Sequence, residues 1–237
     1  MTTKKASYSL WNIKDIIILQ FIAFVIGEIA KTLTETFSSP ETPFFFLFPL
    51  LGHILFLGIL LVWVFYFYEL PVTFFGLTLD NLKKGLNQGL KAGIPFLVMI
   101  IFLVNFPLSA GEAPSFFQPL IKVTDPDSLT TSLLYFIFFA AAIFFVALAV
   151  ELFYRGVVGH FLERKLHPFL AIIVGSSYFS LFWGPFQPGW LLFNFLLALL
   201  LFFFLKKKGS LWPGIVYLTI IQASLIVYVS GGNLFFL

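Results

Sequence analysis

The run from 131 to 160 decides the fold class of this chain, and it reads TSLLYFIFFAAAIFFVALAVELFYRGVVGH. It is almost entirely apolar up to Glu151 and Arg155, an acid and a base four residues apart. An apolar stretch of about 20 residues or more is typical of a helix that crosses a lipid bilayer. Residues four apart share one face of such a helix, and charges inside it are costly and usually functional. We therefore expect a membrane helix with a candidate site at its end.

The composition of the whole chain also indicates a membrane protein. Of the 237 residues, 60% are hydrophobic and only 11% are charged, which is more apolar surface than a soluble domain of this size can bury. The basic residues sit at the ends of apolar runs rather than on one face, so we expect no nucleic-acid partner. Cysteine is absent, which excludes disulfides, thiolate metal sites and a cysteine nucleophile. The lipid bilayer is the expected partner.

Seven apolar runs are candidates for transmembrane helices. They cover residues 12–33, 43–68, 90–108, 131–160, 168–184, 190–205 and 210–230. Leucines recur at helical spacing from Leu79 to Leu90, which predicts an interfacial amphipathic helix before the third run. We predict an all-α, polytopic membrane bundle of about seven transmembrane helices. Residues 1–70 would hold two N-terminal transmembrane helices, and residues 71–237 the core membrane domain.

The distribution of lysines and arginines predicts the orientation. If the N-terminus is cytoplasmic, the inner segments hold eleven of these residues, and the outer segments hold only Lys31 and Lys122. Loops on the cytoplasmic side of a membrane carry an excess of Lys and Arg. We therefore predict a multi-pass protein of the cell membrane with its N-terminus in the cytoplasm and its C-terminus outside.

The chain resembles the CPBP family of intramembrane metalloproteases, which contains CAAX prenyl proteases and bacteriocin-processing (Abi-type) proteins. The stretch from Val150 to Gly156 resembles the family's first motif, Glu-Glu-x-x-x-Arg-Gly. Phe179 and Trp183 have the spacing of the second motif, Phe-x-x-x-His. The segment KGSLWPGI at 208–215 resembles the lead-in to the last motif, His-x-x-x-Asn. The resemblance runs from about residue 73 to residue 224 and implies the family's helical bundle.

In the family that the chain resembles, a glutamate activates water while histidines and an Asn or Asp hold a metal or polarise the substrate. Two motif residues are retained here, Glu151 and Arg155. The other motif positions have changed: Val150 replaces the leading Glu, Trp183 and Leu218 replace the two histidines, and Gln222 replaces the Asn. Valine, tryptophan and leucine cannot ligate a divalent metal. The resemblance therefore implies no bound cofactor in this chain.

Two functions stay open at this point. The first is a non-catalytic pseudoprotease that binds a membrane protein or a peptide, with Glu151 and Arg155 as a structural ion pair. The second is an active intramembrane endopeptidase of the CAAX-protease type, in which Glu151 is the general base of a non-standard site with zinc. His53 is the one histidine well inside an expected span, and it is either a packing residue or a ligand. The sequence favours the pseudoprotease because Val150, Trp183 and Leu218 stand where the motifs have the glutamate and the two histidines. It favours a packing role for His53 because no His, Glu or Asp cluster surrounds that residue.

Overall fold

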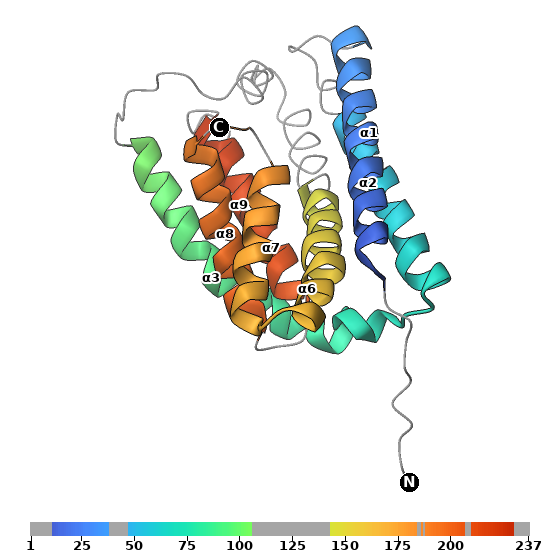
Figure 1. Cartoon of the computed structure of the whole chain (residues 1–237). Helices are drawn as coiled ribbons and strands as arrows, with labels where there is room; N and C mark the ends of the chain where they lie inside the picture. Colours follow the sequence, from blue (N-terminus) through green and yellow to red (C-terminus); the bar gives the residue numbers. More distant parts are fainter. Residues whose placement is uncertain are drawn as a thin grey trace.

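The computed structural model of the chain describes residues 11–37, 47–105, 143–183, 186, 188–206 and 210–229. This described part is helical and contains no strand. Figure 1 shows the helices packed side by side as a bundle, running alternately up and down. Their bounds are α1 (Ile13–Phe37), α2 (Leu47–Leu61), η2 (Val62–Phe67), η3 (Val72–Phe75), α3 (Leu79–Asn105), η4 (Glu151–Gly159), α6 (His160–Lys165), α7 (Pro168–Phe182), α8 (Pro188–Lys206) and α9 (Trp212–Val229). The predicted all-α bundle is confirmed.

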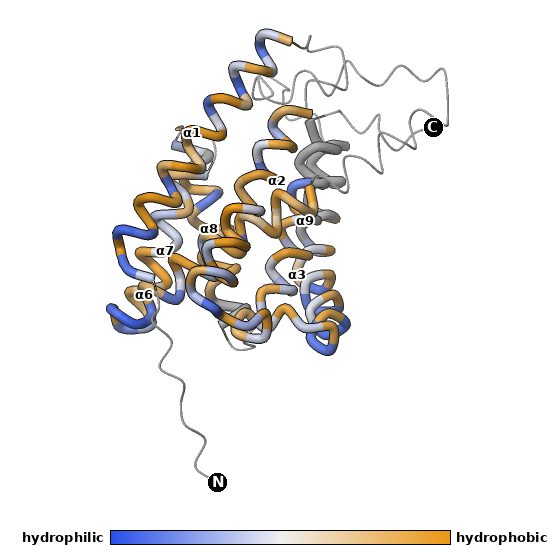
Figure 2. Tube along the Cα trace, turned by 90° about the vertical axis from the view of Figure 1, so that its right-hand side faces the viewer, coloured by the Kyte–Doolittle hydropathy of each residue, from blue (hydrophilic) through white to orange (hydrophobic). Residues whose placement is uncertain are grey.

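The lengths and composition of these helices suit a membrane. Three of them are long and apolar enough to cross one, namely Ile13–Phe37, Leu47–Phe67 and Ile143–Lys165. The helices Pro168–Phe182 and Leu191–Phe202 are apolar but shorter. Figure 2 shows hydrophobic residues along most of the helices and hydrophilic ones gathered near α6 and at the start of α3. Each predicted run contains a described helix, and that all seven cross the bilayer stays a prediction.

Helix α3 joins two predicted elements into one. The interfacial segment and the third apolar run form a single helix, Leu79–Asn105, with Pro95 inside it. Three of the four periodic leucines face away from the bundle, since Leu79, Leu86 and Leu90 are 83%, 41% and 44% exposed, and Leu82 is partly buried. The leucine pattern therefore marks the outer face of α3, where lipid or the interface would meet it.

Over residues 79–95, the fully buried positions of α3 are glycines. Gly85, Gly89 and Gly93 recur every fourth residue and lie against α9. A Cβ atom on Gly89 would be 2.5 Å from the Cβ of Val216, and one on Gly93 would be 2.6 Å from Cδ1 of Ile220. Such distances are too short for real side chains, so the two helices pack this closely only because α3 has glycine there. Small residues serve this purpose at helix interfaces in membranes.

Basic residues gather at one end of the bundle. The starts of α1 and α3 and the ends of α6 and α8 all lie at this end (Figure 1). These segments contain Lys14, Lys83, Lys84, Arg164, Lys165 and Lys206. The arrangement agrees with the charge asymmetry in the sequence, and which end faces the cytoplasm stays a prediction.

Candidate functional site

Glu151 and Arg155 form an ion pair inside the bundle. The Nη1 atom of Arg155 lies 2.5 Å from Oε2 of Glu151, and the two side chains are 9% and 1% exposed. Both residues belong to η4, a π-helix from Glu151 to Gly159. A π-helix bonds each N–H to the carbonyl five residues earlier, and such segments are frequent at functional sites. The pairing expected from the spacing is present, in a wider helix than the sequence indicated.

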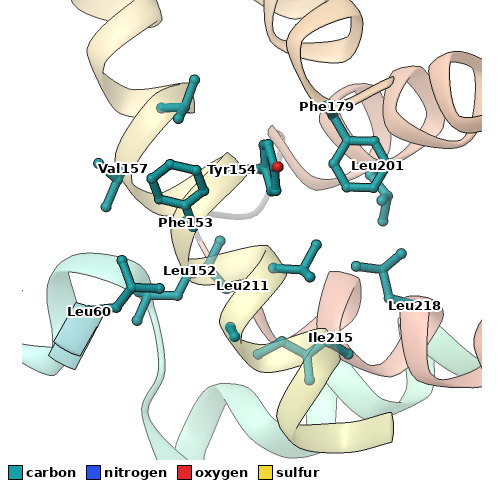
Figure 3. Close-up of a cluster of buried hydrophobic side chains, with 14 of the residues drawn as sticks. Leu60, Leu152, Phe153, Tyr154, Val157, Phe179, Leu201, Leu211, Ile215 and Leu218 are labelled. Atoms are coloured by element: carbon teal, nitrogen blue, oxygen red, sulfur yellow. The ribbon is translucent and has the colours of Figure 1, made fainter. Parts of the chain in front are cut away.

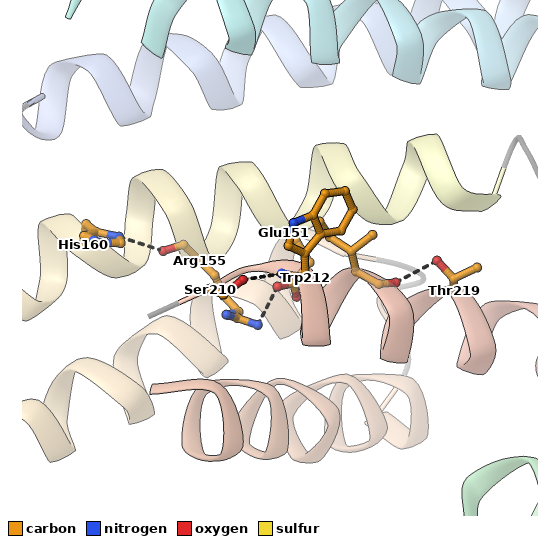
Figure 4. A network of polar contacts seen from close by, with 7 residues as sticks. Glu151, Arg155, His160, Ser210, Trp212 and Thr219 are labelled. Carbon is orange, nitrogen blue, oxygen red and sulfur yellow. Dashed lines mark hydrogen bonds and ion pairs between the residues drawn. The ribbon is translucent and has the colours of Figure 1, made fainter. Parts of the chain in front are cut away.

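The first turn of α9 lies directly over this ion pair. A Cβ atom on Gly214 would overlap the Glu151 carboxylate and the Arg155 guanidinium, so a larger residue at this position would have to displace the two charged groups. Figure 4 shows the pair between η4 and the start of α9. The amino end of a helix carries a partial positive charge, and α9 therefore attracts the carboxylate. Sequence reasoning missed Gly214, because its role depends on a contact with a distant segment.

Polar groups around the pair are occupied by backbone contacts. The Oγ of Ser210 accepts the N–H of Trp212 at 3.3 Å, which caps the start of α9. Thr219 donates its hydroxyl hydrogen to the carbonyl of Ile215 at 2.7 Å, and Nδ1 of His160 lies 3.4 Å from the carbonyl oxygen of Arg155 (Figure 4). None of these contacts brings a second acid or an imidazole nitrogen onto Glu151.

The changed motif positions lie in the hydrophobic core. Leu218 and Val150 are 1% and 3% exposed and belong to one cluster of buried side chains. Figure 3 shows Leu218 among apolar neighbours from other helices, including Phe179. Trp183 packs against the same cluster, and its ring stacks on that of Phe179 with centroids 6.1 Å apart. Gln222 is partly buried, one turn along α9 from Leu218. The fold thus brings the first, second and last motifs to one region and fills it with apolar packing.

The carboxyl end of α7 is fastened to α8 by polar side chains that sequence reasoning also missed. The amide of Asn194, which is 4% exposed, donates to the carbonyl of Trp183. Ser180 donates its hydroxyl hydrogen to the carbonyl of Leu191 at 2.5 Å. The sequence does contain a sign of this contact, an asparagine within a run of leucines and phenylalanines. A buried amide in an apolar helix needs a hydrogen-bond partner. These bonds hold Trp183 in place.

His53 lies beside Trp183, the position of the lost motif histidine. The two ring centroids are 6.1 Å apart, with the rings edge to face at 80°. Nδ1 of His53 is 2.8 Å from the carbonyl oxygen of Pro49, so in the neutral ring Nδ1 carries the hydrogen and Nε2 is unprotonated. Metal-binding histidines are often held in this way. Within the described residues, however, no three His, Asp or Glu side chains are grouped to hold a metal ion. The residues at this site do not fit zinc.

The central part of the chain matches a family model. Residues 132–223 match the model of the family described as type II CAAX prenyl endopeptidase Rce1-like. The match spans Glu151, Arg155, Trp183, Leu218 and Gln222, and it confirms the family resemblance, whereas the assignment of single residues to the motifs stays a prediction. The resemblance before residue 132 stays a prediction. No curated protein and no solved structure matches the chain.

Proposed function

Because residues 132–223 match the model of the Rce1-like type II CAAX prenyl endopeptidases, we propose that this chain is a non-catalytic relative of that family. In this proposal the bundle binds a membrane protein or a membrane-bound peptide and does not cleave it. The observation that carries the proposal is the apolar packing at the motif positions: Leu218 and Val150 are buried in the core, and Trp183 packs against it. A metal-activated water needs nitrogen or oxygen ligands there, and these side chains offer none.

The state of Glu151 gives further support. A general base must reach a water molecule or a substrate proton within hydrogen-bond distance. Here the carboxylate is 1% exposed, Oε2 contacts the Arg155 guanidinium, and the backbone of Gly214 lies against it. This arrangement favours a structural ion pair over a base that exchanges protons with water.

The proposal includes the orientation in the membrane. The basic residues at one end of the bundle would meet anionic headgroups of the cytoplasmic leaflet. This end holds the start of α1 (Figure 1), so the N-terminal side of that helix would be cytoplasmic. The binding partner would then be a protein or peptide of the same membrane.

The test uses the purified full chain in lipid nanodiscs. Its zinc content is measured by elemental analysis, and a farnesylated peptide with a CAAX-type carboxyl end is added. Binding is followed by fluorescence anisotropy, and cleavage by mass spectrometry. We expect substoichiometric zinc and no cleavage, with saturable binding of the peptide or of another membrane ligand.

A matched variant, Glu151→Gln, separates the two functions. It keeps the size of the side chain and removes the base. Cleavage that is lost both in this variant and on chelation of zinc would establish an active peptidase and overturn the proposal. Stoichiometric zinc that is retained in His53→Ala would also contradict the proposal. Such a metal ion would need at least three protein ligands other than His53, and the proposal holds that the site lacks them.

A further inference from the structure

Trp11 lies just before α1 and is inserted into the basic end of the bundle. Its side chain is 1% exposed, although it precedes the first helix. The indole N–H donates to the carbonyl oxygen of Val157 in η4 at 2.6 Å, across 146 residues of sequence. This bond joins the segment before α1 to the π-helix that carries Glu151 and Arg155.

An aromatic box surrounds the indole ring. Phe75 stacks on Trp11 with ring centroids 6.2 Å apart and an interplanar angle of 8°. Tyr68 and Phe74 meet the ring edge to face at 5.8 Å and 6.3 Å. Phe75 in turn lies on η4, because a Cβ atom on Gly156 would be 3.0 Å from its ring. Trp11 therefore packs the connector, the segment 68–78 between η2 and α3 that contains η3, against η4.

The same connector holds the start of α9. The N–H of Leu211 donates to the carbonyl of Phe75 at 3.1 Å, and Ser210 donates its hydroxyl hydrogen to the carbonyl of Gly76 at 2.9 Å. The indole N–H of Trp212 donates to the carbonyl of Thr78 at 3.1 Å. Gly76 has φ of 62°, a backbone conformation that favours glycine. The contacts thus run from Trp11 through the connector to α9 above the ion pair.

Polar bonds fix the backbone of the residues next to Trp11. Arg164 donates from Nη2 to the carbonyl of Trp11 at 2.7 Å. The Asp15 carboxylate accepts the N–H of Asn12 at 2.7 Å and the hydroxyl of Tyr68 at 2.6 Å. Burial and this hydrogen bond raise the pKa of the Tyr68 hydroxyl, which therefore stays protonated as a donor. The chain from residue 11 to residue 15 is thereby tied to α6 and to the end of η2.

We infer that residues 11–15 form a strap that Trp11 locks, and that this strap holds η4 and the start of α9 together over the Glu151–Arg155 pair. Release of Trp11 loosens the connector and opens this junction at the basic end of the bundle. Any partner that displaces the strap would therefore control the state of the site at the Glu151–Arg155 pair. The inference is independent of whether the chain cleaves or only binds its partner.

Cysteine labelling tests the strap directly, because the chain has no cysteine of its own. Ser210→Cys introduces one thiol at the buried junction, where the native serine is 8% exposed. Labelling by N-ethylmaleimide is timed in nanodiscs with Trp11 intact, with Trp11→Phe and with Trp11→Ala. We expect Trp11→Ala to raise the rate by about tenfold or more, since local opening becomes easier. Trp11→Phe, which keeps an aromatic ring but loses the N–H donor, should give an intermediate rate.

Two controls make the result decisive. Ser176→Cys reports on another buried site, on α7, where the serine is 0% exposed. Trp63→Phe removes an indole whose N–H has no hydrogen-bond partner in the described structure, so it should change neither rate. The strap is refuted if Trp11→Ala speeds labelling at Ser176→Cys and Ser210→Cys equally, because Trp11 then stabilises the whole fold. It is equally refuted if neither rate changes.

Discussion

The ion pair between Glu151 and Arg155 gives the sharpest test of what this site has become. Glu151→Ala and Arg155→Ala each leave one charge without its partner in the interior. Replacement of both by leucine removes both charges together. If the pair is structural, each single variant should be much less stable than the native protein, and the double variant should recover most of the loss.

The structure sets the magnitude of the effect. The two charged atoms are 2.5 Å apart, and the side chains are 1% and 9% exposed, so solvent cannot compensate a lone charge. Removal of one partner of a buried pair costs about 3–5 kcal/mol, whereas its replacement by apolar side chains is often neutral or stabilising. A typical protein has only about 5–15 kcal/mol of stability, so the single variants should lose a large share of it.

The assay is unfolding of these proteins in one detergent together with the matched single variants Glu151→Leu and Arg155→Leu, so that the coupling energy is taken from the leucine double-mutant cycle. We expect a favourable coupling of about 2–4 kcal/mol, close to the loss in either single variant. If the single losses simply add in the double variant, the two residues act independently and the account is wrong. If Glu151→Gln leaves stability untouched but abolishes cleavage of a membrane substrate, Glu151 is catalytic and the enzyme reading replaces ours.

Two further predictions concern the bundle itself. Gly89→Ala should destabilise the bundle by about 1–3 kcal/mol in a thermal melt, because the new Cβ atom would lie 2.5 Å from the Cβ of Val216. The control Gly27→Ala should be neutral or slightly stabilising in the same melt, because its new Cβ atom meets nothing within 4 Å. Equal effects of the two alanines would contradict the close packing of α3 on α9. For orientation, an impermeant maleimide should label His167→Cys only from the cytoplasmic side and Phe186→Cys only from outside, and the reverse pattern would invert the topology.

The positions of the helices could be predicted from the sequence because apolar length is a local property. Each predicted run contains a described helix, from α1 at Ile13 to α9 at Val229. The inward face of a helix is harder to predict in a chain of this kind. Leucine periodicity predicted an interfacial amphipathic helix at the start of α3, and Leu79, Leu86 and Leu90 are indeed exposed, but no pattern in the sequence indicated that glycines form the opposite, buried side. In lipid, apolar side chains gain nothing by turning inward, so small residues mark the interface.

The candidate site was predictable only in part, for a related reason. The Glu151–Arg155 contact follows from a spacing of four residues, which the sequence displays. The π-helical winding of η4, the fit of Gly214 over the pair and the position of His53 beside Trp183 all depend on tertiary contacts. Such contacts join segments that lie far apart in the chain, and one sequence contains no pattern that reports them.

The presence of the Glu151–Arg155 pair beside the apolar residues Val150, Trp183 and Leu218 has a physical explanation in this structure. Gly214 lets the backbone of α9 touch both charged groups, so the pair is part of the interface between η4 and α9. A change at either charge would leave its partner buried and unpaired, whereas exchange of a motif histidine for Leu218 or Trp183 leaves no charge behind. In the proposed non-catalytic protein, apolar residues can replace metal ligands without leaving a buried charge, whereas neither partner of the ion pair can be replaced alone at so small a cost. On this argument Glu151 and Arg155 persist for the fold, and their presence alone is no sign of peptidase activity.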